Sequence, residues 1–429
     1  MHRVVLALSG VRGDTRRYRT IHPYEQINLA GVECILSHLT DPKLPEKAGQ
    51  IDLGILHRVP MDGYVGNLLA GFQQRGVPVI VDVDDLVFEP AAFQWIDSPD
   101  FSDPLRASLY LEEMRRQRLT VDACHAVTAS TNFLADEVRP LGKPVWVHRN
   151  AFSLEMLELA EAAYSQHRAK GGRLVIGYAS GTPTHDRDFA LVKPALKQIL
   201  GRYPQVEVWA IGPIDVGKDW GSLAQRIKRL SLVPWRKLPE VLAQFDINLA
   251  PLVMDNPFAQ SKSEIKYMEA GLVRVPTVAS PTEAFQYAIR SGENGYLAAN
   301  LTEWVDMLDL LVGQADVRTT VGKSAYVDVI DRYHPAQRSE ELLATLNKVC
   351  EQVIGEPFLT PEAMVQLRSR ASERRSIETR IDPATEHGPS LGRMALYSLR
   401  HRGVRTLLTR IWIYIRRLLA PVVPFKRTG

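Results

Sequence analysis

Hydrophobic residues along the chain form short β-branched runs that alternate with longer stretches of helical periodicity. Strands and helices that alternate in this way are typical of βαβ units, in which parallel strands form a buried sheet. The pattern predicts strands in the first half at 3–8, 31–36, 52–57, 78–83, 126–129 and 145–148. It predicts strands in the second half at 174–177, 206–212, 247–250, 275–279 and 295–298.

We therefore expect an α/β protein with two doubly wound, Rossmann-like domains that face a cleft. A polar stretch at 162–172, which ends in Gly-Gly, lies between the two series of strands. The predicted parts are a first domain at 1–165, a second at 166–334, a helix at 335–355, a connector at 356–392 and a basic amphipathic tail at 393–429. Ligands of such sheets bind at the carboxyl ends of the strands, which places the site in the cleft.

The composition, with 45% hydrophobic and 24% charged residues in 429, is that of an ordinary globular protein. Its cysteines, Cys34, Cys124 and Cys350, lie far apart without metal-ligand spacing, and we expect them to be reduced in a cytosolic protein. The apolar N-terminal run is followed by arginines and shows no small-residue cleavage site. It is therefore predicted to be a first strand and not a signal peptide.

The basic charge is concentrated at the C-terminal end. The net charge is +3, yet nine Lys and Arg residues and no Asp or Glu follow Gly392, so the rest of the chain is mildly acidic. Proteins that act on nucleic acids more often spread basic charge over their folded surface. We therefore expect no nucleic-acid partner.

The tail has the pattern of an amphipathic helix from Tyr397 to Ala420. Its apolar stripe comprises Val404, Leu407, Leu408, Ile411, Trp412, Ile415, Leu418 and Leu419. The opposite side carries Arg402, Arg405, Arg410, Arg416 and Arg417. So many arginines disfavour a membrane-crossing helix, whereas a helix lying flat on an anionic membrane satisfies both faces. The alternative is a helix that docks its stripe on the protein's own core or on a second subunit.

The most informative stretch is predicted to be a short helix over 261–271, with Ser261 and Glu264 as a capping box and a buried strand after it. Lys262, Lys266 and Glu269 share one face of this helix. Lysines beside the positive end of a helix dipole favour a bound anion such as a phosphate, and a carboxylate further along can accept hydrogen bonds from a ribose. The alternative is an ordinary solvated face with ion pairs.

This stretch resembles the donor-binding signature of retaining bacterial glycosyltransferases of the group 1 or family 4 type, which have the GT-B fold. In that signature an acidic residue in the context Glu-Ala-x-x-x-x-x-Pro-Val-Val holds the ribose of the nucleotide. The Glu-Ala at 269 and the Pro-Thr-Val-Ala at 276 match it. The family often has a second Glu eight residues earlier, where this chain has Ser261. Lys262 and Lys266 match a subgroup with Lys-x-x-x-Lys-x-x-Glu.

The resemblance implies further contacts with the donor. The loop at 177–189 corresponds to the pyrophosphate-binding position, and its small residues let backbone N–H groups approach a phosphate. The segment at 232–239 corresponds to the frame of the base. The predicted donor-binding residues are Gly181, Thr182, His185, Arg187, Val233, Ser261, Lys262, Lys266 and Glu269.

The first half offers candidates for the acceptor side. A buried strand ends in Asp82-Val-Asp-Asp, and Asp84 and Asp85 are the predicted catalytic residues, which hold acceptor hydroxyls, while Asp82 is expected to be structural. An Asp-x-Asp metal site is the less favoured alternative, because the lysines already supply charge for the phosphates. Tyr18 and Arg19 follow the first strand and are predicted to bind acceptor or phosphate.

The resemblance implies a hexosyltransferase that moves a sugar from a nucleotide-sugar donor to a glycan or lipid-linked acceptor in polysaccharide or glycoconjugate synthesis. In the retaining mechanism the leaving diphosphate takes the acceptor proton, so no protein base is required. We expect no metal or other cofactor. The expected location is the cytoplasmic face of the cell membrane, where the enzyme is peripheral through residues 393–429. The alternatives are a nucleotide-sugar epimerase on the same fold and a non-catalytic, membrane-bound assembly subunit.

Overall fold

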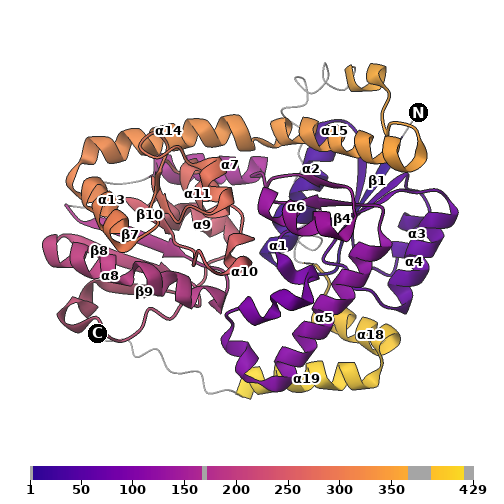
Figure 1. Ribbon diagram of the computed structural model, residues 1–429, viewed down its shortest axis with the longest axis horizontal. Helices are drawn as coiled ribbons and strands as arrows, with labels where there is room; N and C mark the ends of the chain where they lie inside the picture. Colours follow the sequence, from indigo (N-terminus) through magenta and orange to yellow (C-terminus); the bar gives the residue numbers. More distant parts are fainter. Residues whose placement is uncertain (1–2, 167–171, 366–387, 420–429) are drawn as a thin grey trace.

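The computed structural model contains two domains, each a parallel sheet with helices on both faces (Figure 1). It describes residues 3–166, 172–365 and 388–419. Within these residues each sheet has six strands, which confirms the predicted α/β fold with two doubly wound domains.

The first sheet has the strand order β2-β1-β3-β4-β5-β6. Its strands are β1 Val4–Ser9, β2 Glu33–His38, β3 Leu53–His57, β4 Val79–Val83, β5 Ala126–Ala129 and β6 Val145–Val147. Its helices are α1 Asp14–Arg16, α2 His22–Leu29, α3 Leu44–Ala48, α4 Gly63–Gln74, α5 Pro104–Ala123 and α6 Asn132–Val138. Successive side chains of β1 enter opposite cores, Val5 and Ala7 on one face and Leu6 and Leu8 on the other, as a strand's two-residue period requires.

The second sheet has the order β12-β11-β10-β7-β8-β9. Its strands are β7 Leu174–Ala179, β8 Val206–Ile211, β9 Ile227–Leu230, β10 Ile247–Ala250, β11 Thr277–Ala279 and β12 Tyr296–Leu297. Its helices are α7 Leu154–Ser165, α8 Asp186–Arg202, α9 Leu238–Leu242, α10 Pro257–Gln260, α11 Ile265–Leu272, α12 Glu283–Ala288, α13 Leu301–Gly313 and α14 Ala315–Tyr333. Strand β9 did not emerge from the sequence pattern, because its Ile-Lys-Arg-Leu is short and half polar.

The passage from one domain to the other lies earlier than the expected 162–172. Met156, Ala160 and Ala163 of α7 are buried in the core of the second domain, so by its packing α7 belongs to that domain. The second crossing is α15, Pro335–Ile354, whose Leu342 and Leu346 pack into the first domain's core beside α2. Figure 1 shows α14 and α15 running one after the other along one side of both domains.

Buried polar contacts hold the two domains together near the first crossing. Arg149 is buried and binds Glu264, just before α11, with an N–O distance of 3.4 Å, and Glu283 of α12 at 2.5 Å. Its guanidinium also lies 3.5 Å from the ring centroid of Tyr287. The side chain of Asn150 donates to the Ser263 hydroxyl at 2.8 Å. These contacts set the position of α11 relative to the first domain.

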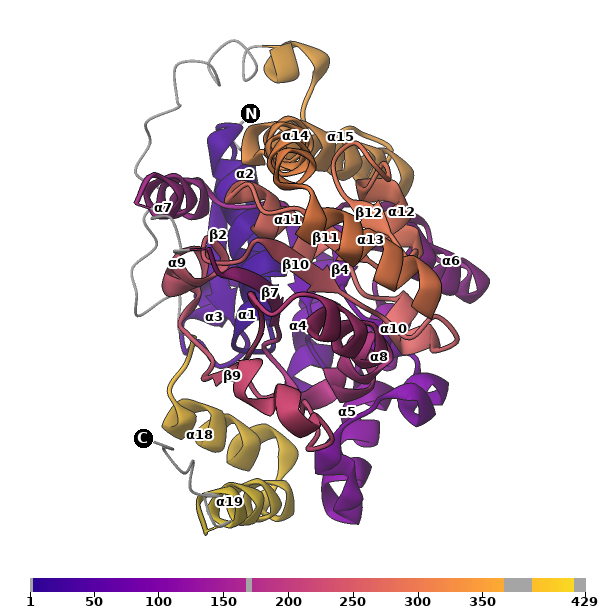
Figure 2. The same ribbon diagram turned by 90° about the vertical axis from the view of Figure 1, so that its left-hand side faces the viewer.

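The predicted tail helix is two helices, α18 Leu391–Arg402 and α19 Val404–Leu419, which we call the C-terminal arm. The helix is interrupted at Gly403, which has a left-handed φ of 84°. The arm lies beside α5 and the first domain in both views (Figures 1 and 2). The side chains of residues 416–419, which include the predicted Arg416, Arg417, Leu418 and Leu419, lie outside the described part, as do residues 420–429.

The arm is attached to the first domain through its polar groups. The Tyr397 hydroxyl donates to Asp62 at 2.8 Å, and Arg402 binds the same carboxylate at 3.3 Å and Glu113 at 3.1 Å. Arg410 binds Glu113 at 3.3 Å. Arg402 and Arg410 therefore neutralise acids of the first domain and do not form a free basic face.

The apolar stripe of α19 remains largely exposed. Its exposed residues are Val404, Leu408, Ile411, Trp412 and Ile415. None of the helices within the described residues is long and apolar enough to span a membrane.

Candidate donor and acceptor site

The predicted helix over 261–271 is shorter than expected, and its capping box is wrong. Asn256 caps a separate helix, α10, by accepting hydrogen bonds from two backbone N–H groups, and Pro257 occupies the first turn, where proline is favoured. The Ser261 hydroxyl donates back to the Phe258 carbonyl at 2.8 Å and is buried. Ser261 therefore has a structural role at the end of α10, and α11 begins only at Ile265.

Of the two predicted phosphate-binding lysines, Lys262 precedes α11 and Lys266 lies in its first turn. The Lys262 ammonium is 2.9 Å from Asp85 of the first domain. The Lys266 ammonium donates to the carbonyl of Ala179, the last residue of β7, and lies 4.9 Å from the Tyr178 ring centroid. Burial lowers the pKa of Lys266, an effect that Glu269 and Asp188 oppose and Lys262 reinforces. The lysine face thus meets the carboxyl end of the sheet.

Glu269 lies one turn further along α11 and is bound from the other domain. The Tyr18 hydroxyl donates to its carboxylate at 2.5 Å. Burial raises the pKa of Glu269, against the hydrogen bond from Tyr18 and the charge of Lys266. Burial, and then the charge of Glu269, raise the pKa of Tyr18 well above its usual range, so Tyr18 remains a neutral hydroxyl donor.

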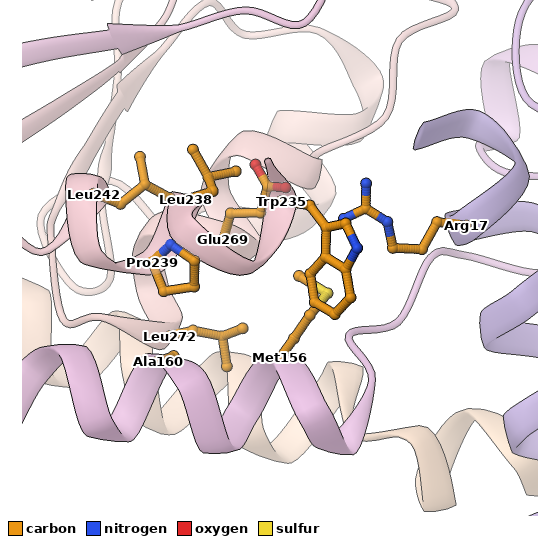
Figure 3. Close-up of a pocket in the computed structure, with 9 residues that line it drawn as sticks. All are labelled: Arg17, Met156, Ala160, Trp235, Leu238, Pro239, Leu242, Glu269 and Leu272. Carbon is orange, nitrogen blue, oxygen red and sulfur yellow. The ribbon is translucent and has the colours of Figure 1, made fainter. Parts of the chain in front are cut away.

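A small pocket opens beside Glu269 (Figure 3). Its walls are mostly apolar, with Met156, Ala160, Leu238, Pro239, Leu242 and Leu272. Arg17, Trp235 and Glu269 are its lining residues with polar groups. Arg17 reaches in from the first domain, with its guanidinium 4.5 Å from the Trp235 ring centroid. Predicted Val233 is half-buried in the loop that leads to Trp235.

His185 lies near the same two lysines. Its ring Nδ1 is 2.7 Å from Asp188, which also accepts from the backbone of Val253 at 2.9 Å. Burial lowers the pKa of His185, an effect that Asp188 opposes and that nearby Lys266 and Lys262 reinforce. Asp188, which is not among the predicted site residues, therefore orients His185.

The other predicted residues of this loop lie at the entrance to α8. Gly181 and Thr182 are exposed, and an added Cβ on Gly181 would meet Asp14 of the first domain at 3.6 Å. Arg187 is exposed in the first turn of α8. The loop thus faces the first domain across the cleft.

On the first domain, Asp84 and Asp85 are held by Arg58. The guanidinium binds Asp84 at 2.7 Å and Asp85 at 2.6 Å, and His57 lies 3.3 Å from Asp84. Burial raises the pKa of Asp84, but Arg58 and His57 outweigh it and hold the pKa well below its usual range. Arg58 has a left-handed φ of 48°, a conformation uncommon outside glycine that is often found at functional sites.

The packing of this strand end depends on one glycine. A Cβ on Gly10 would lie 2.1 Å from the carbonyl oxygen of Arg58, so the loop after β1 can pass Arg58 only without a side chain. No sequence pattern indicates the left-handed conformation of Arg58, so Arg58 is not among the predicted site residues.

Arg19 was predicted to bind acceptor or phosphate, but it does not face the cleft. It is buried, with its guanidinium bound to both oxygens of Asp82 at 2.8 and 2.6 Å and to the carbonyl of His148 at 2.9 Å. Thr128 donates to the same Asp82 at 2.8 Å. Arg19 and Asp82 are therefore structural, and it is Arg17 that enters the site.

The geometry brings together Lys262, Lys266, Glu269 and His185, in a sequence that also matches a known family. Residues 173–313 match the model of the family Glycosyl transferases group 1. The matched residues lie within the second domain and include His185, Lys262, Lys266 and Glu269. This confirms the resemblance drawn from the motif around Glu269.

Solved structures show the same fold over most of the chain. HepE from Anabaena, in complex with UDP and glucose, is 14% identical with a TM-score of 0.56, covering 81% of this chain and 100% of that chain. Sucrose-phosphate synthase from Thermosynechococcus elongatus is 13% identical with a TM-score of 0.56, covering 82% and 99%. A glycosyltransferase from Rickettsia africae is 11% identical with a TM-score of 0.54, covering 82% and 99%. No curated protein sequence matches the chain. At these identities the likeness establishes the GT-B fold.

Proposed function

We propose that the protein is a retaining glycosyltransferase that moves a hexosyl group from a nucleotide-sugar donor to a glycan or lipid-linked glycan acceptor. The observation that carries this proposal is the cluster of Lys262, Lys266, His185 and Glu269 at the carboxyl end of β7, in the domain that matches group 1 glycosyl transferases. HepE from Anabaena was solved with UDP and glucose, which makes UDP-sugars the first donors to test.

The proposed mechanism follows from the charges on the two sides of the cleft. Lys262 and Lys266 bind the diphosphate and stabilise the negative charge that develops on it as the glycosidic bond breaks. Glu269 accepts hydrogen bonds from the ribose. Asp84 and Asp85 hold the acceptor hydroxyl, and the leaving phosphate takes its proton. Closure of the domains excludes water and sets the distance between the two substrates.

The first experiment measures release of nucleoside diphosphate from UDP-glucose, UDP-N-acetylglucosamine and GDP-mannose, with and without extracted lipid-linked glycans. We expect release that depends on the acceptor and is lost in Lys262→Met and Lys266→Met. Conversion of the sugar without an acceptor would instead indicate an epimerase. A protein that neither binds nor cleaves any of these donors would contradict the proposal and favour a non-catalytic subunit.

We also propose that transfer needs no metal, because two lysines supply the charge for the diphosphate. The carboxylate of Asp82, the first acid of the Asp-x-Asp triplet, is bound by Arg19 and Thr128. Activity is therefore expected to persist in EDTA. Loss of activity on chelation that Mn²⁺ or Mg²⁺ restores would contradict this.

Finally, we propose that the enzyme is bacterial and works on the cytoplasmic face of the cell membrane, held there by the C-terminal arm. In support, apolar residues of α19 such as Leu408 and Trp412 are exposed, and the basic Arg393, Arg400 and Arg405 are exposed on the same arm. Such a surface suits an anionic bilayer interface. An acceptor anchored in that membrane would then lie beside the first domain.

A further inference from the structure

The first domain places its own side chains on two groups that the proposed function assigns to the donor. Tyr18 donates to Glu269 at 2.5 Å, and Asp85 binds Lys262 at 2.9 Å. Both pairs join residues far apart in sequence, separated by 251 and 177 positions. The contacts therefore span the cleft in which the donor would lie.

The chemistry of these two partners matches that of the donor parts they would face. A hydroxyl donates to Glu269, as a ribose hydroxyl would, and an anionic oxygen accepts from Lys262, as a phosphate would. Lys262 and Glu269 are thus each bound by a protein group of the same hydrogen-bonding type as the donor group expected there. A phosphate at Lys262 and a ribose hydroxyl at Glu269 would therefore compete with Asp85 and Tyr18 for these two groups.

Asp85 can leave Lys262 without becoming an unpaired buried charge. Its other oxygen is bound by Arg58 at 2.6 Å, and the same guanidinium binds Asp84 at 2.7 Å. A half-buried carboxylate that keeps one cationic partner avoids most of the desolvation penalty of an unpaired one. The exchange of Lys262 from Asp85 to a phosphate is therefore inexpensive.

We propose that Asp85 and Tyr18 occupy the donor site until a nucleotide sugar displaces them, and that this displacement frees Asp85 to bind the acceptor hydroxyl. The inference rests on the proposed function and deepens it. Donor binding then prepares the acceptor side, because Asp85 keeps Arg58 and loses Lys262. The acceptor is expected to bind more tightly once the diphosphate is in place.

The test is calorimetric titration of the full-length protein with UDP and, in parallel, GDP. Asp85→Asn removes the competitor and is expected to bind UDP about two- to fivefold more tightly than wild type, which corresponds to the upper part of the range for a partly exposed ion pair. Asp84→Asn is the matched control, since it removes the same charge from the same strand end without touching Lys262. The gain in UDP affinity of Asp84→Asn is expected to be clearly smaller than that of Asp85→Asn.

A double-mutant cycle separates exchange from a general charge effect. In a Lys262→Met background, Asp85→Asn is expected to change UDP affinity little, because the group over which phosphate and carboxylate compete is gone. Tyr18→Phe in the wild-type background is expected to tighten UDP binding through Glu269 in the same way.

The outcomes distinguish this inference from the function on which it rests. The exchange would be overturned if Asp85→Asn bound UDP no more tightly than wild type does. It would also be overturned if Asp84→Asn gained as much UDP affinity as Asp85→Asn, or if Asp85→Asn gained as much in the Lys262→Met background. The proposed function would stand if wild type still bound UDP or GDP and Lys262→Met weakened it. If neither wild type nor any variant binds either nucleotide, both proposals fail.

Discussion

At the scale of single residues, Glu269 is the acid that the proposed function assigns to the ribose of the donor. We predict that Glu269→Ala weakens UDP binding about tenfold to a hundredfold, because a hydrogen bond to a charged group contributes roughly 1.5–3 kcal/mol. Calorimetry measures the affinity, and circular dichroism checks the fold. Glu293→Ala, which removes an exposed carboxylate from the same domain, is the control and should bind normally. Wild-type affinity in Glu269→Ala would remove Glu269 from the site.

His22 gives the protein a predictable dependence on pH. It is buried, its Nδ1–H donates to the Ala151 carbonyl at 2.7 Å, and burial, reinforced by Arg17, lowers its pKa to about 3. An unfolded histidine titrates near 6.5, so between about pH 6.5 and 3 the unfolded state binds a proton that the folded state does not. The contribution of neutral, buried His22 to the free energy of unfolding is therefore present above pH 6.5 and is lost as the pH falls below that value.

The measurement compares urea unfolding of wild type and His22→Gln at pH 7.5 and 5.5. The difference in the free energy of unfolding between the two proteins is expected to be about 1.4 kcal/mol smaller at pH 5.5, since wild type alone bears the cost of keeping His22 neutral. A difference that does not change with pH would show that His22 becomes protonated in the folded state.

At the scale of elements, the position of α11 depends on close packing by α14. A Cβ on Gly322 would lie 2.1 Å from the carbonyl oxygen of Arg274, in the turn between α11 and β11 where Arg274 has a left-handed φ of 61°. We predict that Gly322→Ala lowers the free energy of unfolding by about 1–3 kcal/mol, the usual cost of overpacking.

Gly201 supplies the matched control, because it also lies in a helix but an added Cβ there meets no atom within 4 Å. Gly201→Ala is expected to be neutral or to stabilise by up to about 1 kcal/mol, since alanine favours helix. Chemical unfolding of both variants is the measurement. Equal effects at the two positions would mean that α14 can shift away from Arg274 at no cost.

At the scale of the whole molecule, the C-terminal arm is the proposed membrane-binding element. We predict that the full chain sediments with liposomes that contain phosphatidylglycerol, and that added salt weakens binding by screening the arginines. The double variant Leu408→Glu and Trp412→Glu is expected to lose most of this binding, as is deletion of residues 391–429. Val327→Glu is the control, because Val327 is an exposed apolar residue on α14, outside the arm.

Two results would contradict a membrane role for the arm. One is that the full chain fails to bind these liposomes at low salt. The other is that the double variant binds them as well as wild type does. A concentration-dependent dimer that the double variant abolishes would instead show that the stripe docks on a second copy.

The amino-acid sequence by itself determined the two series of strands apart from β9, the fold class, the helix that carries Lys266 and Glu269, and the amphipathic character of the tail. These are local properties. The two-residue and 3.6-residue periods are set by backbone geometry within a few positions, and the motif around Glu269 spans about one short helix and one strand. The periods and the motif can therefore be recognised in the sequence without knowledge of what each segment will contact.

The tertiary structure alone decided which side chains meet across the cleft. Arg17 and Arg19 are cations two residues apart, but only the π-helical turn Arg17–Ile21 determines that Arg19 turns inward to Asp82 while Arg17 reaches Trp235. Ser261 fitted a capping box, yet Asn256 and Pro257 started an earlier helix and left Ser261 at its end. The pairs Tyr18 with Glu269 and Asp85 with Lys262 form between separate domains, because the cores and buried ion pairs at the crossing fix how the domains approach, and no local pattern records that.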